Sequence, residues 1–404
     1  MTAKSKVPQI RFKGFSGEWE TKQLGEIGSV AMNKRIFKNQ TTEKGDIPFY
    51  KIGTFGGTAD AFISRQLFED YKSKYPYPQK GDLLISASGS IGRIVEYKGE
   101  DEYFQDSNIV WLKHEDKIEN SFLKQFYNIV KWNGLEGSTI QRLYNKNILD
   151  TEISFPKDRI EQTKIGDYFQ QLDKLIEQKE KKYQKLKQFK KAMLDKMFPK
   201  NGADTPEIRF KGFSGKWEEK RLEEIALIKT GYPFDSNKFD ANGEYLVITN
   251  GNIQNDFSFV DNLLGNKINI EDKCSLTEYI LNLNDILVTM DGTVGRVAKV
   301  IHEKQILAQR VGRIIALIDS DFVYYFLSTG DFFKKMKLIS TGGTIKHISL
   351  NDISKYESYI PKDFEEQEKI GNYFQKLDKQ IDLQQKELEK LKNIKKASLS
   401  KMFV

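Results

Sequence analysis

The most constraining feature of this 404-residue chain is that it contains the same long pattern twice. Residues 8–20 read PQIRFKGFSGEWE and residues 206–218 read PEIRFKGFSGKWE, so 11 of 13 positions are identical. Further along, EQTKIGDYFQQLDKLI (161–176) and EQEKIGNYFQKLDKQI (366–381) share 12 of 16 residues. A repeat of about 200 residues is far longer than a solenoid unit of roughly 20–50 residues, and it indicates a tandem duplication of a whole domain with its following helix. Two similar halves are therefore expected.

The composition is that of a folded protein with no sign of membrane insertion. Apolar residues make up 39% of the chain and aromatic residues 12%, enough for packed cores in two or three domains. No run approaches the roughly 18 apolar residues of a membrane span. The first residues also lack the apolar stretch of a signal peptide, so the cytoplasm is the expected location. The single cysteine, Cys274, and three scattered histidines (His114, His302, His347) argue against a disulfide or a metal centre.

Positive charge is concentrated in one segment of the chain. The formal net charge is +7, and residues 157–200 hold 13 Lys or Arg against 7 Asp or Glu, so most of the excess lies there. Such a segment forms either the solvated face of a helix or a surface along a nucleic-acid backbone. The sequence leaves both interpretations open.

A long helical pattern follows each globular stretch. Its apolar residues recur at alternating spacings of three and four, which is the heptad pattern of a coiled coil. Two similar helices in one chain are expected to pair antiparallel, and the alternative is that each packs only on its own domain. The predicted seam consists of Leu172, Ile176, Lys179, Tyr183, Leu186, Lys190 and Met193 in the first helix, and of Leu377, Ile381, Gln384, Leu388, Leu391 and Lys395 in the second.

Polar breaks in the two seams predict a register for this pairing. Matching polar with polar residues sets Lys179 opposite Lys395 and Lys190 opposite Gln384. The lysine ammonium groups would then reach outward on their alkyl stems, because two charges buried together are costly. The helices would overlap for roughly 40 Å. The paired helices are therefore expected to set a fixed spacing.

The globular halves mix short helical and strand patterns, so the predicted fold class is mixed α/β (α+β). Four parts follow along the chain: a first domain at 1–156, a helix at 157–199, a second domain at 200–361 and a C-terminal helix at 362–404, in an expected pseudo-two-fold arrangement. The halves differ most at 33–80 and 230–282, which favours a shared frame carrying two recognition surfaces. Helical patterns are predicted at 22–32 and 220–229, and strands at 47–52, 82–86, 91–97, 108–112, 244–249, 286–289 and 311–318.

Two glycine-rich segments, SASGSIGR (86–93) and TMDGTVGR (289–296), each follow an apolar strand. Neither has the spacing of a phosphate-binding loop or of a dinucleotide fingerprint, so each predicts a tight turn that also permits close backbone approach to a ligand. Polar side chains in and near the turns are candidates for contacts with base edges or phosphates of DNA, or are simply exposed loop residues. The candidates are Ser88, Ser90, Arg93, Ser138, Thr139, Gln141 and Arg142 in the first half, and Asp291, Thr293, Arg296, Gln309, Arg310, Thr344, Lys346 and His347 in the second.

No catalytic motif accompanies these turns. Asp158 with Glu177 and Lys179 looks like a nuclease pattern, but the acid and the lysine lie on the heptad helix, where alternating charges are routine. Motifs of adenine methyltransferases, zinc proteases and serine hydrolases are absent from the sequence. We therefore expect a chain that does no chemistry by itself.

Taken in this order and twice, these segments resemble the DNA specificity subunits of type I restriction-modification systems over nearly the whole length. The resemblance rests on Gly17 with Trp19, on Gly215 with Trp217, on the GDLL and NDIL strands with their glycine turns, and on helices that end in KKAMLDKMF and KKASLSKMF. It implies two target recognition domains that each read one half of a split DNA sequence in defence against foreign DNA. It also implies an antiparallel helix pair that docks two methylation subunits.

The same resemblance assigns all chemistry to partner subunits. The methylation subunits would bind S-adenosylmethionine and methylate adenine, and restriction subunits would translocate and cleave DNA with ATP and Mg. Two other functions remain open: a stand-alone DNA methyltransferase or nuclease, and a coiled-coil scaffold without sequence readout. Binding of S-adenosylmethionine by the purified chain would favour the first, and absence of DNA binding in the assembled complex would favour the second.

Overall fold

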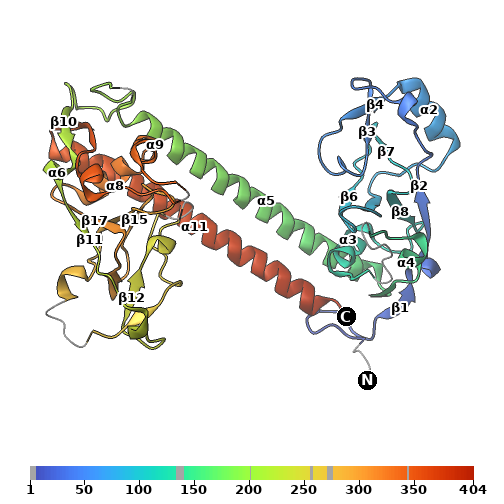
Figure 1. The fold of residues 1–404 in the computed structure, drawn as a ribbon. Helices are drawn as coiled ribbons and strands as arrows, with labels where there is room; N and C mark the ends of the chain where they lie inside the picture. Colours follow the sequence, from blue (N-terminus) through green and yellow to red (C-terminus); the bar gives the residue numbers. More distant parts are fainter. Residues whose placement is uncertain (1–5, 133–140, 201, 255–257, 271–275, 344) are drawn as a thin grey trace. The chain divides into compact units, whose positions relative to one another are not determined.

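The computed structural model describes residues 6–132, 141–200, 202–254, 258–270, 276–343 and 345–404. They form two compact units (Figure 1). The first unit comprises residues 1–179 and 387–404, and the second comprises residues 180–386. The helices α5 (Arg159–Lys196) and α11 (Phe364–Met402) each contribute one part to each unit.

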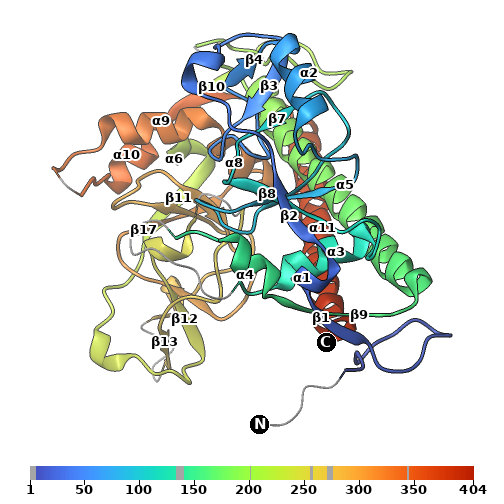
Figure 2. The same ribbon diagram turned by 90° about the vertical axis from the view of Figure 1, so that its right-hand side faces the viewer.

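The described residues of the first domain form three sheets. A central antiparallel sheet has the order β2-β8-β5-β6, and a smaller sheet, β4-β3-β7, has β7 parallel to β3. The smaller sheet and α2 lie at the opposite end of the domain from the β1-β9 pair (Figure 1 and Figure 2). The elements are β1 (Glu20–Gln23), α1 (Leu24–Ile27), β2 (Ser29–Met32), the 3-10 turn η1 (Lys38–Gln40), β3 (Ile47–Tyr50), β4 (Ala61–Ile63), α2 (Arg65–Lys74), β5 (Leu83–Ser86), β6 (Ile94–Glu96), β7 (Tyr103–Phe104), β8 (Ile109–Lys113), α3 (Asn120–Ile129), α4 (Asn145–Leu149) and β9 (Glu152–Phe155).

The second domain repeats this topology. Its central sheet has the order β11-β17-β14-β15, its smaller sheet is β13-β12-β16, and β10 pairs with β18. The duplication and the mixed α/β class predicted from the sequence are thereby confirmed. The elements are β10 (Glu218–Arg221), α6 (Leu222–Ile225), β11 (Ala226–Thr230), η2 (Ser236–Lys238), β12 (Tyr245–Ile248), η3 (Asn250–Asn252), β13 (Lys267–Ile268), η4 (Thr277–Tyr279), β14 (Ile286–Thr289), β15 (Val297–Lys299), β16 (Gln305–Leu307), β17 (Val311–Ala316), α8 (Ser320–Leu327), α9 (Gly330–Ile339), α10 (Leu350–Ser354) and β18 (Glu357–Ile360).

The helices predicted at 22–32 and 220–229 are wrong. Each segment is instead a strand, one turn of helix and a second strand. In the first domain the two strands pair with β9 and β8, and those ladders satisfy backbone groups that a helix would have satisfied locally. Pairing with distant strands therefore decides the structure against a helical periodicity of only three turns.

The repeated segment at the start of each half attaches the domain to its long helix. The Arg11 guanidinium donates two hydrogen bonds to the Glu161 carboxylate, at 2.6 and 2.7 Å, and Glu161 is fully buried. Arg209 and Glu366 repeat this pair with the same distances. Such bidentate bonds are among the strongest that a carboxylate can accept, and they compensate the cost of burying it. In both pairs these hydrogen bonds raise the pKa of the arginine.

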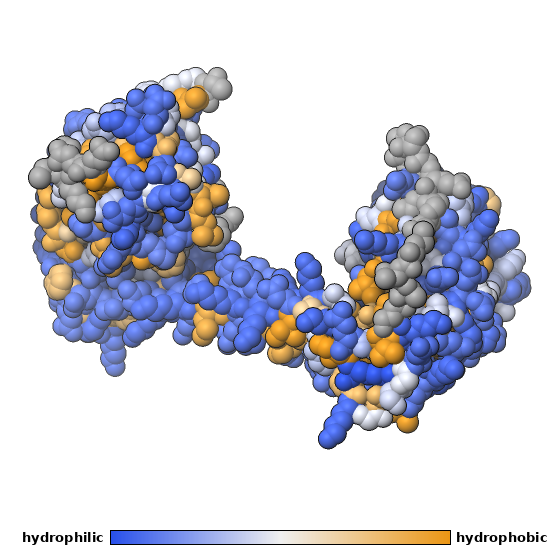
Figure 3. All heavy atoms as spheres, turned by 90° about the horizontal axis from the view of Figure 1, so that it is seen from below, coloured by the Kyte–Doolittle hydropathy of each residue, from blue (hydrophilic) through white to orange (hydrophobic). Residues whose placement is uncertain are grey.

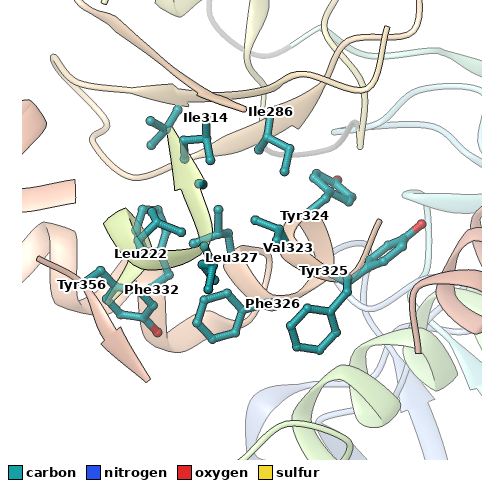
Figure 4. Close-up of a cluster of buried hydrophobic side chains, with 14 of the residues drawn as sticks. Leu222, Ile286, Ile314, Val323, Tyr324, Tyr325, Phe326, Leu327, Phe332 and Tyr356 are labelled. Carbon is teal, nitrogen blue, oxygen red and sulfur yellow. The ribbon is translucent and has the colours of Figure 1, made fainter. Parts of the chain in front are cut away.

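The end of a long helix closes the core of each domain. In the first unit the Phe403 ring stacks on Phe122, with 5.0 Å between ring centroids, and meets Trp19 edge to face at 6.0 Å. In the second unit Phe198, just beyond α5, contacts Trp217 in the same way. Figure 4 shows the neighbouring side chains of α6, α8 and α9 converging below the central sheet of the second domain. The methionine and the phenylalanine of the repeated KMF sequence are thus part of both cores.

Replacing Phe403 by Ala is expected to destabilise the first unit by about 3–5 kcal/mol, because the side chain is buried among aromatic rings. Val404→Ala is the matched control, since that side chain is 40% exposed. Hydrogen exchange of the purified protein should show faster exchange around Trp19 and unchanged exchange around Trp217. Unchanged protection around Trp19 would show that the helix end does not hold this core.

The helices α5 and α11 lie side by side in opposite directions within each unit (Figure 1). In the first unit Lys395 pairs with Asp173 at 2.6 Å, and in the second unit Lys190 pairs with Asp378 at 2.5 Å. All thirteen predicted seam residues are buried or half-buried, whereas most of their neighbours on the helices are exposed. The antiparallel pairing is therefore confirmed, and the predicted seam residues lie on the less exposed side of each helix.

The register of this pairing differs from the prediction by about one heptad. Lys190 pairs with Asp378 rather than facing Gln384, and Lys179 pairs with Glu387 rather than facing Lys395. The prediction matched polar with polar seam residues, but each seam lysine finds a carboxylate on the partner helix and needs no polar residue opposite. In the second unit the Tyr325 hydroxyl donates to the same Asp378 carboxylate at 2.8 Å. This network fixes the register there, because either charge alone would be buried without a partner.

None of the described helices combines the length and the apolarity that a membrane crossing requires. On the face drawn in Figure 3, hydrophilic residues predominate and apolar residues form small groups. Most large apolar side chains instead belong to internal clusters such as those around Trp19 and Trp217.

Candidate nucleic-acid interface

The two glycine-rich segments form tight turns that join β5 to β6 and β14 to β15. Gly92 and Gly295 both have a φ of 79°, a backbone conformation that side chains rarely adopt. A Cβ atom at Gly295 would also lie 2.7 Å from the Met336 Cβ. The glycines are thus required by the turn, as the sequence predicted.

A hydroxyl group stabilises each turn from within. The Thr289 hydroxyl donates to the Thr293 carbonyl at 2.6 Å and accepts from the Arg296 backbone N–H at 3.0 Å. Ser86 makes the same two interactions in the first domain. The turns are therefore fixed in shape, and the side chains on them are presented from a rigid base.

Next to the first turn, side chains from three distant segments form a first polar cluster: Ser88, Ser107, Asn108 and Arg142. The Ser88 hydroxyl donates to the Asn108 side-chain oxygen at 2.8 Å. The Arg142 guanidinium donates to the Ser107 hydroxyl at 2.9 Å and to the Asn108 oxygen at 3.4 Å. Apart from Arg142 the cluster is uncharged.

The second domain has a second polar cluster in the same place: Asp291, Arg310 and His347. One oxygen of the Asp291 carboxylate contacts the His347 Nδ1 at 2.5 Å, and the other accepts from the Arg310 guanidinium at 3.1 Å. The Asp291 side chain is only 14% exposed, whereas those of Arg310 and His347 are 70% and 51% exposed. The carboxylate therefore holds two side chains that point their remaining polar groups outward.

The two clusters stand on the same backbone frame. In each domain the residue that follows β5 or β14 bonds to the two other segments. In the first domain the Ala87 N–H donates to the Asn108 carbonyl, and the Ala87 carbonyl accepts from the Leu143 N–H, both at 2.8 Å. In the second domain the Met290 N–H donates to the Arg310 carbonyl at 3.3 Å, and the Met290 carbonyl accepts from the Ile348 N–H at 2.9 Å. Isolated bridges join Ser88 to Arg142 and Asp291 to His347. These contacts make Asn108 equivalent to Arg310 and Arg142 equivalent to His347. Equivalent positions therefore carry different side chains on one shared frame.

Comparison with known proteins identifies this frame. The family model described as "Type I restriction modification DNA specificity domain" matches residues 16–188 and 214–393, which is most of the chain. The chain belongs to the family of type I restriction-modification DNA specificity subunits. The two matched segments correspond to the two halves that the sequence repeat defines.

Relatives of this specificity subunit include a Haemophilus influenzae protein, provisionally named as a type I restriction enzyme specificity subunit, that is 52% identical over 173 residues. That match covers 40% of the chain and 45% of the relative, so it spans less than half of that protein's length. A Methanocaldococcus jannaschii protein, provisionally named as the MjaX specificity subunit, is 24% identical over 402 residues and covers 94% and 91%. The crystal structure of the S subunit from M. genitalium has the same fold, with a TM-score of 0.64 at 16% identity over 98% and 99% of the two chains.

The other predicted contact residues of the specificity subunit surround the clusters without joining them. Ser90 and Arg93 are exposed on the first turn, where the Arg93 guanidinium donates to the Phe55 carbonyl at 2.7 Å. The Lys346 ammonium group donates to the Gly342 carbonyl at 3.0 Å. Gln141, Thr293 and Gln309 are exposed and Arg296 is half-buried, while Ser138, Thr139 and Thr344 lie outside the described residues.

Sequence reasoning missed Ser107 and Asn108, which hold Arg142 in the first cluster. A signal for them exists. In the strands that follow this loop, Ile109 pairs with Ser86 and Val311 pairs with Thr289, so the repeat offset there is 202 and Asn108 corresponds to Arg310, a predicted contact residue. Applying the repeat offset to every candidate would have found this position.

The clusters offer donors and acceptors but no catalytic arrangement. Hydroxyl, amide, carboxylate, guanidinium and imidazole groups are those that distinguish base pairs in the major groove of DNA. Among the residues that the structure describes, no group of His, Cys, Asp or Glu is placed to hold a metal ion. What the geometry supports is recognition.

Proposed function

We propose that this chain gives a type I restriction-modification complex its sequence specificity, each domain reading one half of a split DNA target. The observation that carries this proposal is the pair of polar clusters. They occupy equivalent places on one backbone frame and present different side chains, Arg142 in one domain and Arg310 in the other. Two domains of this kind read two different sequences, because the pattern of donors and acceptors determines which base edges fit.

The paired helices then hold the two domains at a set separation and dock two methylation subunits. Support comes from the length of α5 and α11, which are 38 and 39 residues. Their ion pairs recur along both units, so the helix pair has a defined register and is not free to slide. A fixed register is what a constant spacer between half-sites requires.

In this proposal the chain itself is not catalytic. Partner methylation subunits bind S-adenosylmethionine and methylate adenine, and restriction subunits use ATP and Mg to translocate and cleave DNA in the cytoplasm. The chain contributes double-stranded DNA recognition and assembly surfaces. DNA affinity is expected to be high only in the complex, because the partners add phosphate contacts.

Mapping methylated adenines in the DNA of host cells tests the proposal. Cells that carry this chain with its methylation subunit should methylate one split sequence. Deleting the gene for this chain should remove that methylation completely, and reintroducing it should restore the same sequence. A methylation pattern that persists after deletion contradicts the proposed function. Methyl transfer by the purified chain alone would instead indicate a stand-alone enzyme.

A further inference from the structure

Each polar cluster contains one arginine that its neighbours hold in place. In the first cluster, the Arg142 guanidinium is half-buried and donates to two side chains, those of Ser107 and Asn108. In the second, the Arg310 guanidinium donates to Asp291 and is 70% exposed. Of the three segments that form each frame, Arg142 belongs to the last in chain order, whereas Arg310 belongs to the middle one. They therefore occupy non-equivalent positions within equivalent clusters.

An arginine held in this way retains free donors for a ligand. A guanidinium has five N–H donors in a rigid plane, and each contact here is made by a single terminal nitrogen. The remaining N–H groups suit the two acceptors, N7 and O6, that guanine presents in the major groove. Fixing the side chain beforehand lowers the entropy cost of forming that bidentate contact.

The surroundings of Arg310 favour a base edge over a phosphate. Asp291 places a carboxylate beside the guanidinium, and a phosphate oxygen brought to the same place would be repelled by it. A guanine edge carries no net charge, so its partly negative N7 and O6 atoms meet a weaker repulsion than a phosphate does. The backbone at Arg310 is also held at a positive φ of 75°, so the direction of the side chain is set by the frame.

We propose that Arg310 and Arg142 each read a guanine, one in each half-site, with Asp291 as the positioning residue for Arg310. This inference rests on the proposed function and adds the base and the side chains that read it. It predicts that both half-sites contain a guanine. It also predicts that the two arginines act on different halves of the sequence.

The test uses the assembled complex of this chain with its methylation subunits. Methylated adenines are mapped, and affinities are measured for DNA that carries each base at each position, over a range of salt concentrations. Arg310→Ala and Arg310→Lys should relax one guanine position in a single half-site, with discrimination there reduced roughly 5- to 150-fold. Lysine keeps the charge but lacks the planar pair of donors, so charge alone should not restore reading. Asp291→Asn should relax the same position to a smaller extent.

Arg142→Ala is the matched comparison, because it should relax one position in the other half-site and leave the first unchanged. Arg221→Ala removes an exposed arginine of β10 that pairs with Glu357 of β18, and it should change neither half. Thermal melting checks that each variant remains folded. The inference is overturned if the half-sites lack guanine, or if the sequence preference of Arg310→Lys matches that of the wild type. It is also overturned if Arg310→Ala weakens binding equally for all sequences and lowers the salt slope by about one, because that is the result expected for a phosphate contact. A wild-type complex that reads no split sequence would instead contradict the proposed function itself.

Discussion

Replacing residues 8–155 with the corresponding domain of a family member of different specificity is expected to change one half of the methylated sequence completely. The other half and the spacer should remain, because the second domain and the helix pair are untouched. The incoming domain must carry an arginine and a tryptophan equivalent to Arg11 and Trp19, since Glu161 and Phe403 stay in place to receive them. Sequencing of methylated adenines in cells that express the chimera measures both halves at once.

The reciprocal exchange of residues 206–360 is the control for this result, and it should change only the other half. A second control takes the first domain from a relative that reads the same half-site, which should leave the methylated sequence as it was. If either exchange altered both halves, the assignment of one domain to one half-site would be wrong. A folded chimera that keeps the original sequence would show that recognition lies outside the exchanged residues.

Much of the fold could be predicted because the information is local or repeated. The heptads of α5 and α11 and the strands such as β5 and β14 follow from periodicity, and the duplication doubles each signal. The register of the helices could not be predicted in the same way, because a shift of one heptad leaves every seam residue facing the partner. Flanking carboxylates such as Asp378 and Glu387 decide between the registers, and the prediction had counted only seam residues. The failed helix at 22–32 has a similar origin, because its two strands pair with the distant strands β9 and β8.

The candidate site, like the fold, could be predicted from the sequence only in part. Five of the seven cluster residues were candidates from the sequence, namely Ser88, Arg142, Asp291, Arg310 and His347, because they are polar and lie in or near the glycine turns or the matching loops. Their convergence could not be predicted, since each cluster brings together three segments through single backbone hydrogen bonds. Ser107 and Asn108 stand in an ordinary polar loop, and apart from the repeat offset only their contacts with Arg142 and Ser88 distinguish them. That these residues contact DNA stays a prediction.

Lengthening both helices by one heptad is expected to lengthen the unread spacer of the target by about three base pairs. The structure sets where the insertions belong: after Gln178 and after Leu388, because the Lys179–Glu387 ion pair shows that these points face each other in the antiparallel pair. Seven residues add roughly 10 Å of helix, and each base pair adds ~3.4 Å along DNA. Both half-sites should be unchanged, since neither domain is altered. Mapping of methylated adenines reads the spacer directly.

The affinity of this variant should fall even though its spacer is defined. Seven residues complete two turns of a helix to within about 20°, whereas three base pairs turn DNA by roughly 100°. The DNA or the helices must therefore twist for both half-sites to be contacted. Inserting the heptad in α5 alone is the control. It would displace Lys190 from Asp378 while Lys395 still faces Asp173, and the conflict should abolish specific methylation. An active, folded double insertion that methylates the original spacer would show that the helix pair does not set the distance between the half-sites.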